Sequence, residues 1–211
     1  MEEKSWVVKV SFKSNIQNIS AGVSGIQLHQ NNNLQGKKYY AATISDEKIN
    51  EAFSKISDSK TYSRLEKMMI LALIPIVDET SLNSRTGFIL STTKGNITAL
   101  KNPTDENFKQ AHLHQLAKNV ANFFNFKTQP IVISNACVSG ILAVSVARRL
   151  IQSELFDTIY VVAGDEVSEF VLSGFNSFQA MSDLPCKPYS KNRTGVSLGE
   201  ATAAVLISAN K

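Results

Sequence analysis

Short apolar runs alternate with segments of helical period along most of the chain, and this alternation limits the possible folds more than any other feature. The apolar runs lie at residues 6–10, 86–92, 130–134, 158–164 and 200–208. The segments of helical period lie at residues 63–77, 103–124, 137–151 and 167–181. Strands that alternate with helices form a largely parallel sheet, because each right-handed crossover lays its helix on a face of that sheet. The sequence therefore predicts an α/β fold: a mostly parallel five-stranded sheet with helices on both faces.

No linker divides these elements into two units. At 211 residues the chain can form one substantial core, so we expect a single domain over residues 1–211. Residues 14–35 are rich in Asn, Gln, Gly and Ser and are predicted to form a loop. The longest apolar run, residues 68–77, is too short to cross a bilayer, and the first residues lack the features of a secretory signal. A cytoplasmic protein is expected.

Charge and cysteine content argue against several classes of function. The formal net charge is +4 with basic residues spread along the chain, whereas nucleic-acid-binding proteins normally concentrate them on one face. An acidic partner such as a carrier protein stays open. The two cysteines lie in unrelated contexts, so neither a disulfide framework nor a metal site is indicated. His112 and His114 are expected at the surface, pointing to different faces of a helix.

Cys137 lies at the point where an apolar strand turns into a helix. The strand ends near Ser134, and a helix rich in small residues, among them Ser139 and Gly140, follows the cysteine. Cys137 is therefore expected at the carboxyl edge of the sheet, where ligands of open α/β sheets bind. A helix N-terminus favours a thiolate, and its backbone amides can hold an oxyanion. The position predicts a nucleophile.

Each cysteine also has a structural interpretation. Free cysteines are often small buried core residues, and position alone does not decide between that role and catalysis for Cys137. Cys186 lies between Pro185 and Lys187-Pro188, in a predicted loop, and is assigned a structural role.

Two groups of motifs resemble those of β-ketoacyl-carrier-protein synthases, which are condensing enzymes of the thiolase-like superfamily. Residues 135–140, Asn-Ala-Cys-Val-Ser-Gly, are similar to that family's Ala-Cys-Ser-Ser nucleophile motif. Residues 185–201 are similar to its Pro-Cys-Arg-Pro-Phe-Asp, Arg-Asp-Gly and Gly-Glu-Gly series, with Ser190 and Thr194 where the family usually has aspartates and Ala201 where it often has glycine. The resemblance covers residues 85–211 well, and it continues weakly at residues 22–26, Gly-Val-Ser-Gly-Ile.

The resemblance implies the N-terminal half of such a synthase, with Cys137 as its nucleophile. Cys137 would take an acyl group from a carrier-protein thioester. A malonyl-carrier thioester would then lose carbon dioxide, and its carbanion would attack the acyl-cysteine to give a β-ketoacyl product for fatty acid or polyketide-type synthesis. Family members use two histidines to stabilise the enolate, and both come from the second half of their chain. No cofactor and no metal are implied.

That second half is absent from this chain, which ends just after the last strand of the first of the family's two β-α units. The histidines, His29, His112 and His114, all precede Cys137. The resemblance therefore implies that the chain is inactive alone and needs the C-terminal half of the synthase or a complementary subunit. Acyl carrier protein is the other implied partner, and a homodimer is expected. The alternative is a non-catalytic subunit that binds a carrier protein or a partner synthase.

Overall fold

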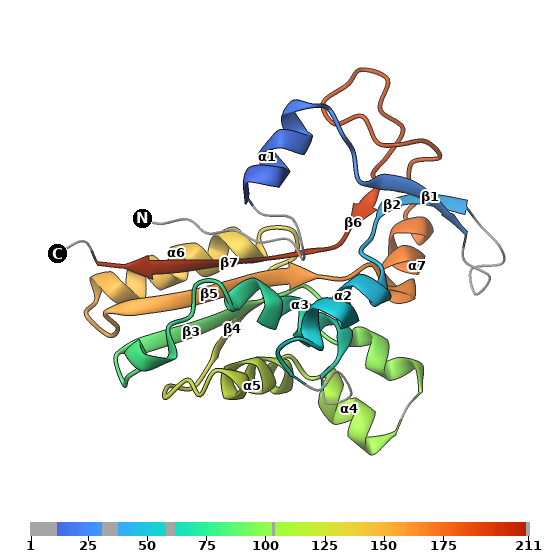
Figure 1. Cartoon of the computed structure of the whole chain (residues 1–211). Helices are drawn as coiled ribbons and strands as arrows, with labels where there is room; N and C mark the ends of the chain where they lie inside the picture. The colour runs from blue at the N-terminus through green and yellow to red at the C-terminus, as the bar shows by residue number, and fades with distance from the viewer. Residues whose placement is uncertain (1–11, 31–37, 58–61, 103, 210–211) are drawn as a thin grey trace.

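Residues 12–30, 38–57, 62–102 and 104–209 are described by a computed structural model of the chain (Figure 1). The larger of its two sheets has four strands in the order β4 (Ile131–Ile133), β3 (Thr86–Ser91), β5 (Thr158–Asp165) and β7 (Ala201–Ser208). β3 runs parallel to β4 and β5, whereas β7 runs antiparallel to β5. The predicted α/β fold with a mostly parallel sheet is confirmed. The first of the five predicted strands, residues 6–10, lies outside the described residues.

Helices cover both faces of this sheet, as predicted. α3 (Arg64–Leu73) and α5 (Leu113–Phe123) cover one face, and α6 (Ser139–Gln152) covers the other (Figure 1). Successive side chains of β3 point to opposite faces, so Phe88 packs under α3 and α5 whereas Ile89 packs against α6. A strand that is buried on both faces is mostly apolar, and this is why the sequence shows it clearly.

α3 begins where the sequence indicates and ends earlier than predicted. The Ser63 hydroxyl accepts a hydrogen bond from the Glu66 amide, and the Glu66 carboxylate accepts one from the Ser63 amide, which completes a capping box. The prediction extended this helix to residue 77. It ends at Leu73, because Pro75 lacks the amide hydrogen that a further turn would need.

The single helix predicted over residues 103–124 is wrong. The structure contains α4 (Asp105–Ala111) and then α5, separated by His112, whose φ of −68° and ψ of 130° are extended. α5 buries Leu116 and Val120 in the core, whereas α4 has no buried residue and packs beside the 3₁₀ helix η3 (Ile97–Lys101). One extended residue is enough to change the direction of the chain, and the helical period of the sequence does not reveal it.

A smaller sheet lies beyond the carboxyl end of β5 (Figure 1). It contains β1 (Ile26–Gln30), β2 (Lys38–Ala42) and β6 (Leu198–Gly199), with β1 antiparallel and β6 parallel to β2. α1 (Phe12–Ser20) precedes it. The loop predicted over residues 14–35 is therefore wrong for residues 14–20 and 26–30, while residues 31–37 lie outside the described residues. β1 is largely exposed, so a polar sequence can form it.

The remaining elements are α2 (Asp46–Phe53), the 3₁₀ helix η2 (Glu79–Ser81) and α7 (Glu169–Ser177). α6 and α7 each begin two residues after the predicted start. A periodic pattern does not fix a helix boundary more closely than one or two residues. None of the described helices is long and apolar enough to span a membrane.

Candidate active site

The turn between β4 and α6 places Cys137 at the carboxyl edge of the larger sheet. β4 ends at Ile133 and α6 begins at Ser139, so the cysteine lies where the strand-to-helix pattern predicts. The carboxyl ends of β3 and β5 lie at the same edge, because the three strands are parallel. Cys137 is exposed, so the interpretation of this residue as part of the buried core is wrong.

Hydrogen bonds hold this turn on both sides of the cysteine. The Val138 amide donates to the Asn135 carbonyl and the Ser139 amide donates to the Ala136 carbonyl, each at 3.2 Å. The Ser139 hydroxyl accepts from the Asn135 amide at 2.8 Å and donates to the Ala136 carbonyl at 2.6 Å. Ala136 has a φ of 45°, in the left-handed region that costs a non-glycine residue about 1–2 kcal/mol. Cys137 therefore follows a strained residue and precedes a helix.

Small residues let α6 lie close to the sheet behind this turn. Ala143 and Ala147 are fully buried in the core beside β3 and β5. A methyl group at Gly140 would lie 3.4 Å from the Cβ atom of Ala163. The outer side of the helix is apolar as well, since Ile141 is 70% exposed and Val144 is also exposed. The described residues thus cover only one of the two apolar sides of α6.

Cys186 lies in the loop between α7 and β6, as predicted, and its side chain is partly buried. In the same loop the hydroxyls of Ser182 and Thr194 lie 2.7 Å apart and share a hydrogen bond. Arg193 donates to the Ser190 carbonyl at 3.1 Å. The resemblance leads one to expect aspartates at positions 190 and 194. In this chain the Ser190 carbonyl and the Thr194 hydroxyl make the contacts instead.

The histidines lie in two other places. His29 is in β1, with its Nε2 atom 3.1 Å from the Ala41 carbonyl oxygen. His112 and His114 are exposed, as predicted, with ring centroids 5.3 Å apart. The prediction that these two point to different faces is wrong, because His112 links α4 to α5 and is not helical. Among the described residues, no group of three or more His, Cys, Asp or Glu side chains could hold a metal ion.

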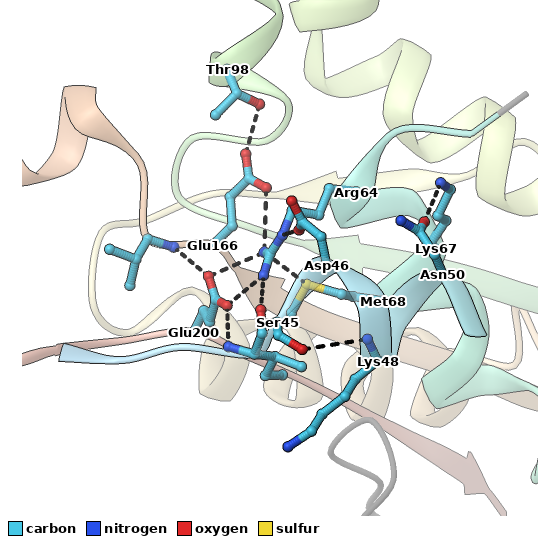
Figure 2. Close-up of polar contacts among 12 residues, drawn as sticks. Ser45, Asp46, Lys48, Asn50, Arg64, Lys67, Met68, Thr98, Glu166 and Glu200 are labelled. Carbon is cyan, nitrogen blue, oxygen red and sulfur yellow. Dashed lines mark hydrogen bonds and ion pairs between the residues drawn. The ribbon is translucent and has the colours of Figure 1, made fainter. Parts of the chain in front are cut away.

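Charged side chains also gather where the two sheets meet (Figure 2). The Arg64 guanidinium donates to Glu200 at 2.6 and 3.1 Å and to Asp46 at 2.6 Å. It also donates to the Ile44 carbonyl. Glu200 in turn accepts hydrogen bonds from the amides of Ile44 and Val167. Glu200 links β6 of the smaller sheet to β7 of the larger sheet. These contacts therefore hold α3, and the segments that follow β2 and β5, against the link between the two sheets.

Glu166 completes this group, which we call the Arg64 cluster: Arg64, Asp46, Glu166 and Glu200. The side chains of Glu200 and Glu166 are 2% and 4% exposed, and Arg64 lies 3.8 Å from Glu166. Burial raises the pKa of Glu166 above its ordinary value, although the Thr98 hydrogen bond and Arg64 oppose this effect. Burial lowers the pKa of Arg64, but hydrogen bonds to Glu200 and Asp46 outweigh it, so the net pKa is raised. An open cavity of about 440 Å³ lies beside the cluster, and Cys137 is not among its lining residues.

Comparison with protein families decides the class of the chain. Residues 9–211 match the family model described as the N-terminal domain of β-ketoacyl synthase. The chain belongs to this family. The resemblance read from the motifs around Cys137 and Cys186 is confirmed, and a search of curated proteins found no match.

Solved structures of ketosynthases share the fold of this β-ketoacyl synthase domain. A ketosynthase from Xenorhabdus doucetiae, solved in complex with its chain length factor, has 20% identity and a TM-score of 0.75 over 99% of this chain and 58% of that chain. A β-ketoacyl synthase from Burkholderia phymatum STM815 has 17% identity and a TM-score of 0.75 over 99% of this chain and 60% of that chain. A ketosynthase from module 6 of the Bacillus subtilis 168 bacillaene synthase has 16% identity and a TM-score of 0.77 over 98% of this chain and 38% of that chain. The domain thus spans less than two thirds of these proteins.

Sequence reasoning predicts the position of Cys137 in this β-ketoacyl synthase domain and misses the Arg64 cluster. The strand, turn and helix around Cys137 are adjacent in the sequence, so a local pattern is enough. Arg64 and Glu200 are 136 positions apart, and no local pattern joins them. One signal is present nonetheless: Ser63 and Glu66 have the spacing of a capping box, which marks Arg64 as the first residue of a helix.

Proposed function

We propose that this domain is the acyl-accepting part of a condensing enzyme and that Cys137 is its nucleophile. The observation that carries the proposal is the place of Cys137, exposed at the carboxyl edge of a mostly parallel sheet and immediately before α6. Its sulfur attacks the carbonyl carbon of an acyl-carrier thioester, the acyl group moves to the cysteine, and the carrier thiol leaves. The malonyl-carrier thioester then loses carbon dioxide, and its carbanion displaces the cysteine sulfur to give a β-ketoacyl-carrier product for fatty acid or polyketide-type synthesis.

The decarboxylating step requires groups from outside this chain. The chain's three histidines lie in β1 and at the junction of α4 and α5, where they contact other groups of the domain or each other. We therefore propose that the C-terminal half of a synthase, or a complementary subunit, supplies the two histidines that the resemblance implies. A complementary subunit has a parallel in the Xenorhabdus ketosynthase, which was solved in complex with its chain length factor.

The outer side of α6 supports a partner of this kind. Val138 is 50% exposed next to Cys137, and Ile141 and Val144 continue the same apolar surface along the helix. Exposed apolar surfaces of this sort are normally covered by another chain or domain. A partner seated there would lie beside Cys137. A homodimer, which the resemblance also implies, and a cytoplasmic location stay predictions.

Condensation assays with and without a second half test the proposed function. The chain is mixed with an acyl-carrier protein and malonyl-carrier protein, alone or with the separately produced C-terminal half of a synthase, and products are followed by mass spectrometry. The proposal expects a β-ketoacyl product only when both halves are present, and none with Cys137→Ala. Product formation by the Cys137→Ala mixture would refute the role of Cys137.

A second candidate function is a non-catalytic subunit that binds a carrier protein or a partner synthase. The exposed apolar side of α6 favours it, since that surface could serve binding alone. Binding of a partner synthase by the parent and by Cys137→Ala with equal affinity, without any condensation product from either, would select this alternative.

A further inference from the structure

Ser139 is buried directly behind the turn that presents Cys137. Only 4% of Ser139 is exposed, whereas residues 134–138 are all exposed. Ser139 is the first residue of α6, and its hydroxyl reaches back across the turn to the residues on the other side of the cysteine. It accepts from the Asn135 amide at 2.8 Å and donates to the Ala136 carbonyl at 2.6 Å, so both its accepting and its donating capacity are used inside the turn.

These two bonds act on a strained segment. Ala136 has a φ of 45°, and an alanine at positive φ relaxes to a commoner conformation unless its surroundings hold it. The two backbone bonds of the turn are each 3.2 Å long, so they are longer than both bonds of the Ser139 hydroxyl. Loss of the hydroxyl would therefore leave the two longer backbone bonds to hold the turn. Cys137 lies inside this turn, between Ala136 and Ser139.

We propose that Ser139 is a positioning residue for Cys137. Its hydroxyl holds the strained turn so that the sulfur stays exposed immediately before α6, where an electrophile can reach it. The inference rests on the proposed function for its purpose. The position that the hydroxyl enforces is a property of the folded chain and can be measured without any acyl substrate.

The rate at which iodoacetamide alkylates Cys137 tests the inference. The parent carries Cys186→Ala, so that Cys137 is the one remaining thiol of a chain with two cysteines. Ser139→Ala is expected to slow alkylation at least fivefold, while Ser139→Thr, which keeps a hydroxyl, stays within twofold of the parent. The matched control is Ser153→Ala, which removes a hydroxyl that donates to the Leu150 carbonyl at the other end of α6 and should also stay within twofold. Global destabilisation would not slow alkylation of a thiol that is already exposed.

Two results would overturn the inference: alkylation of Ser139→Ala within twofold of the parent, or a Ser139→Thr variant as slow as Ser139→Ala. If circular dichroism shows Ser139→Ala to be unfolded, Ala136→Gly with Ser139→Ala is compared with Ala136→Gly alone, because glycine adopts positive φ without the strain. Because glycine removes the strain that the hydroxyl resists, the double variant should alkylate within twofold of Ala136→Gly, and a fivefold slowing there would refute the inference. Acyl transfer is measured in parallel. A parent that alkylates but never acylates, even with the second half of a synthase present, refutes the proposed function, and the alkylation rates still decide the role of Ser139.

Discussion

Replacing Arg64 by alanine would leave two buried carboxylates without their cation. Glu200 and Glu166 have side chains that are 2% and 4% exposed, so in the folded chain they depend on protein groups to compensate their burial. Removal of one partner from a buried ion pair costs about 3–5 kcal/mol. Because the Arg64 side chain is itself 26% exposed, the lower end of that range, about 3 kcal/mol, is the expected loss in the free energy of unfolding.

Thermal unfolding followed by circular dichroism measures this loss. For a domain of this size, a loss of 1 kcal/mol lowers the Tm by about 2–4 °C, so Arg64→Ala should lower it by about 6–12 °C. Arg64→Lys keeps the charge and loses the planar fork that contacts both oxygens of Glu200, so its Tm should lie between those of the parent and the alanine variant. The double variant Arg64→Ala with Glu200→Gln should lose less stability than the sum of the losses of the two single variants, because both substitutions remove the same interaction.

Arg85→Ala is the matched control. Arg85 pairs with Asp157 at 2.7 Å, but about half of each side chain is exposed, so water already screens the pair. Its loss should leave the Tm nearly unchanged. An Arg64→Ala variant whose Tm falls no further than that of Arg85→Ala would refute the view that the Arg64 cluster stabilises the junction of the two sheets.

Three further variants test other parts of the structure. Burial raises the pKa of Glu166, so its contribution to stability is present below the ordinary value of 4.5 and is lost as the pH rises through the folded-state pKa. The stability of Glu166→Gln relative to the parent should therefore increase from pH 4 to pH 8 in urea unfolding, and parallel curves would contradict this. Gly164→Ala should destabilise the domain by about 1–3 kcal/mol, since its Cβ atom would lie 2.8 Å from the Ala201 carbonyl oxygen. Gly174→Ala in α7 meets no atom within 4 Å and should instead stabilise by about 0.5–1 kcal/mol. A Tm of Gly164→Ala at or above that of the parent, or a Tm of Gly174→Ala below it, would contradict the corresponding expectation.

The parts of the fold that the sequence predicts are those with a strong local cause. β3 and β5 are buried on both faces, so their residues are apolar in unbroken runs. The start of α3 is marked by the Ser63 and Glu66 capping box, and Cys137 is marked by the change from strand to helix. Each of these signals lies within a few residues of the feature that it predicts.

The parts that the sequence does not reveal depend on distant contacts or on exposure. β1 forms its bonds with β2 through the backbone while most of its side chains are exposed, so its polar residues resemble those of a loop. The break at His112 follows from the separate packing of α4 and α5. The Arg64 cluster joins residues from α2, from α3, from the end of β5 and from the link between β6 and β7, and no periodicity connects them.

Mass spectrometry of the chain after incubation with an acyl-CoA or acyl-carrier thioester tests the central claim most directly. The proposed function predicts one added acyl group, located by peptide mapping to the peptide that contains Cys137. The adduct should be absent from Cys137→Ala and unchanged in Cys186→Ala. An adduct of equal extent in Cys137→Ala, or no adduct on Cys137 even with the second half of a synthase present, would contradict the claim that Cys137 is the nucleophile.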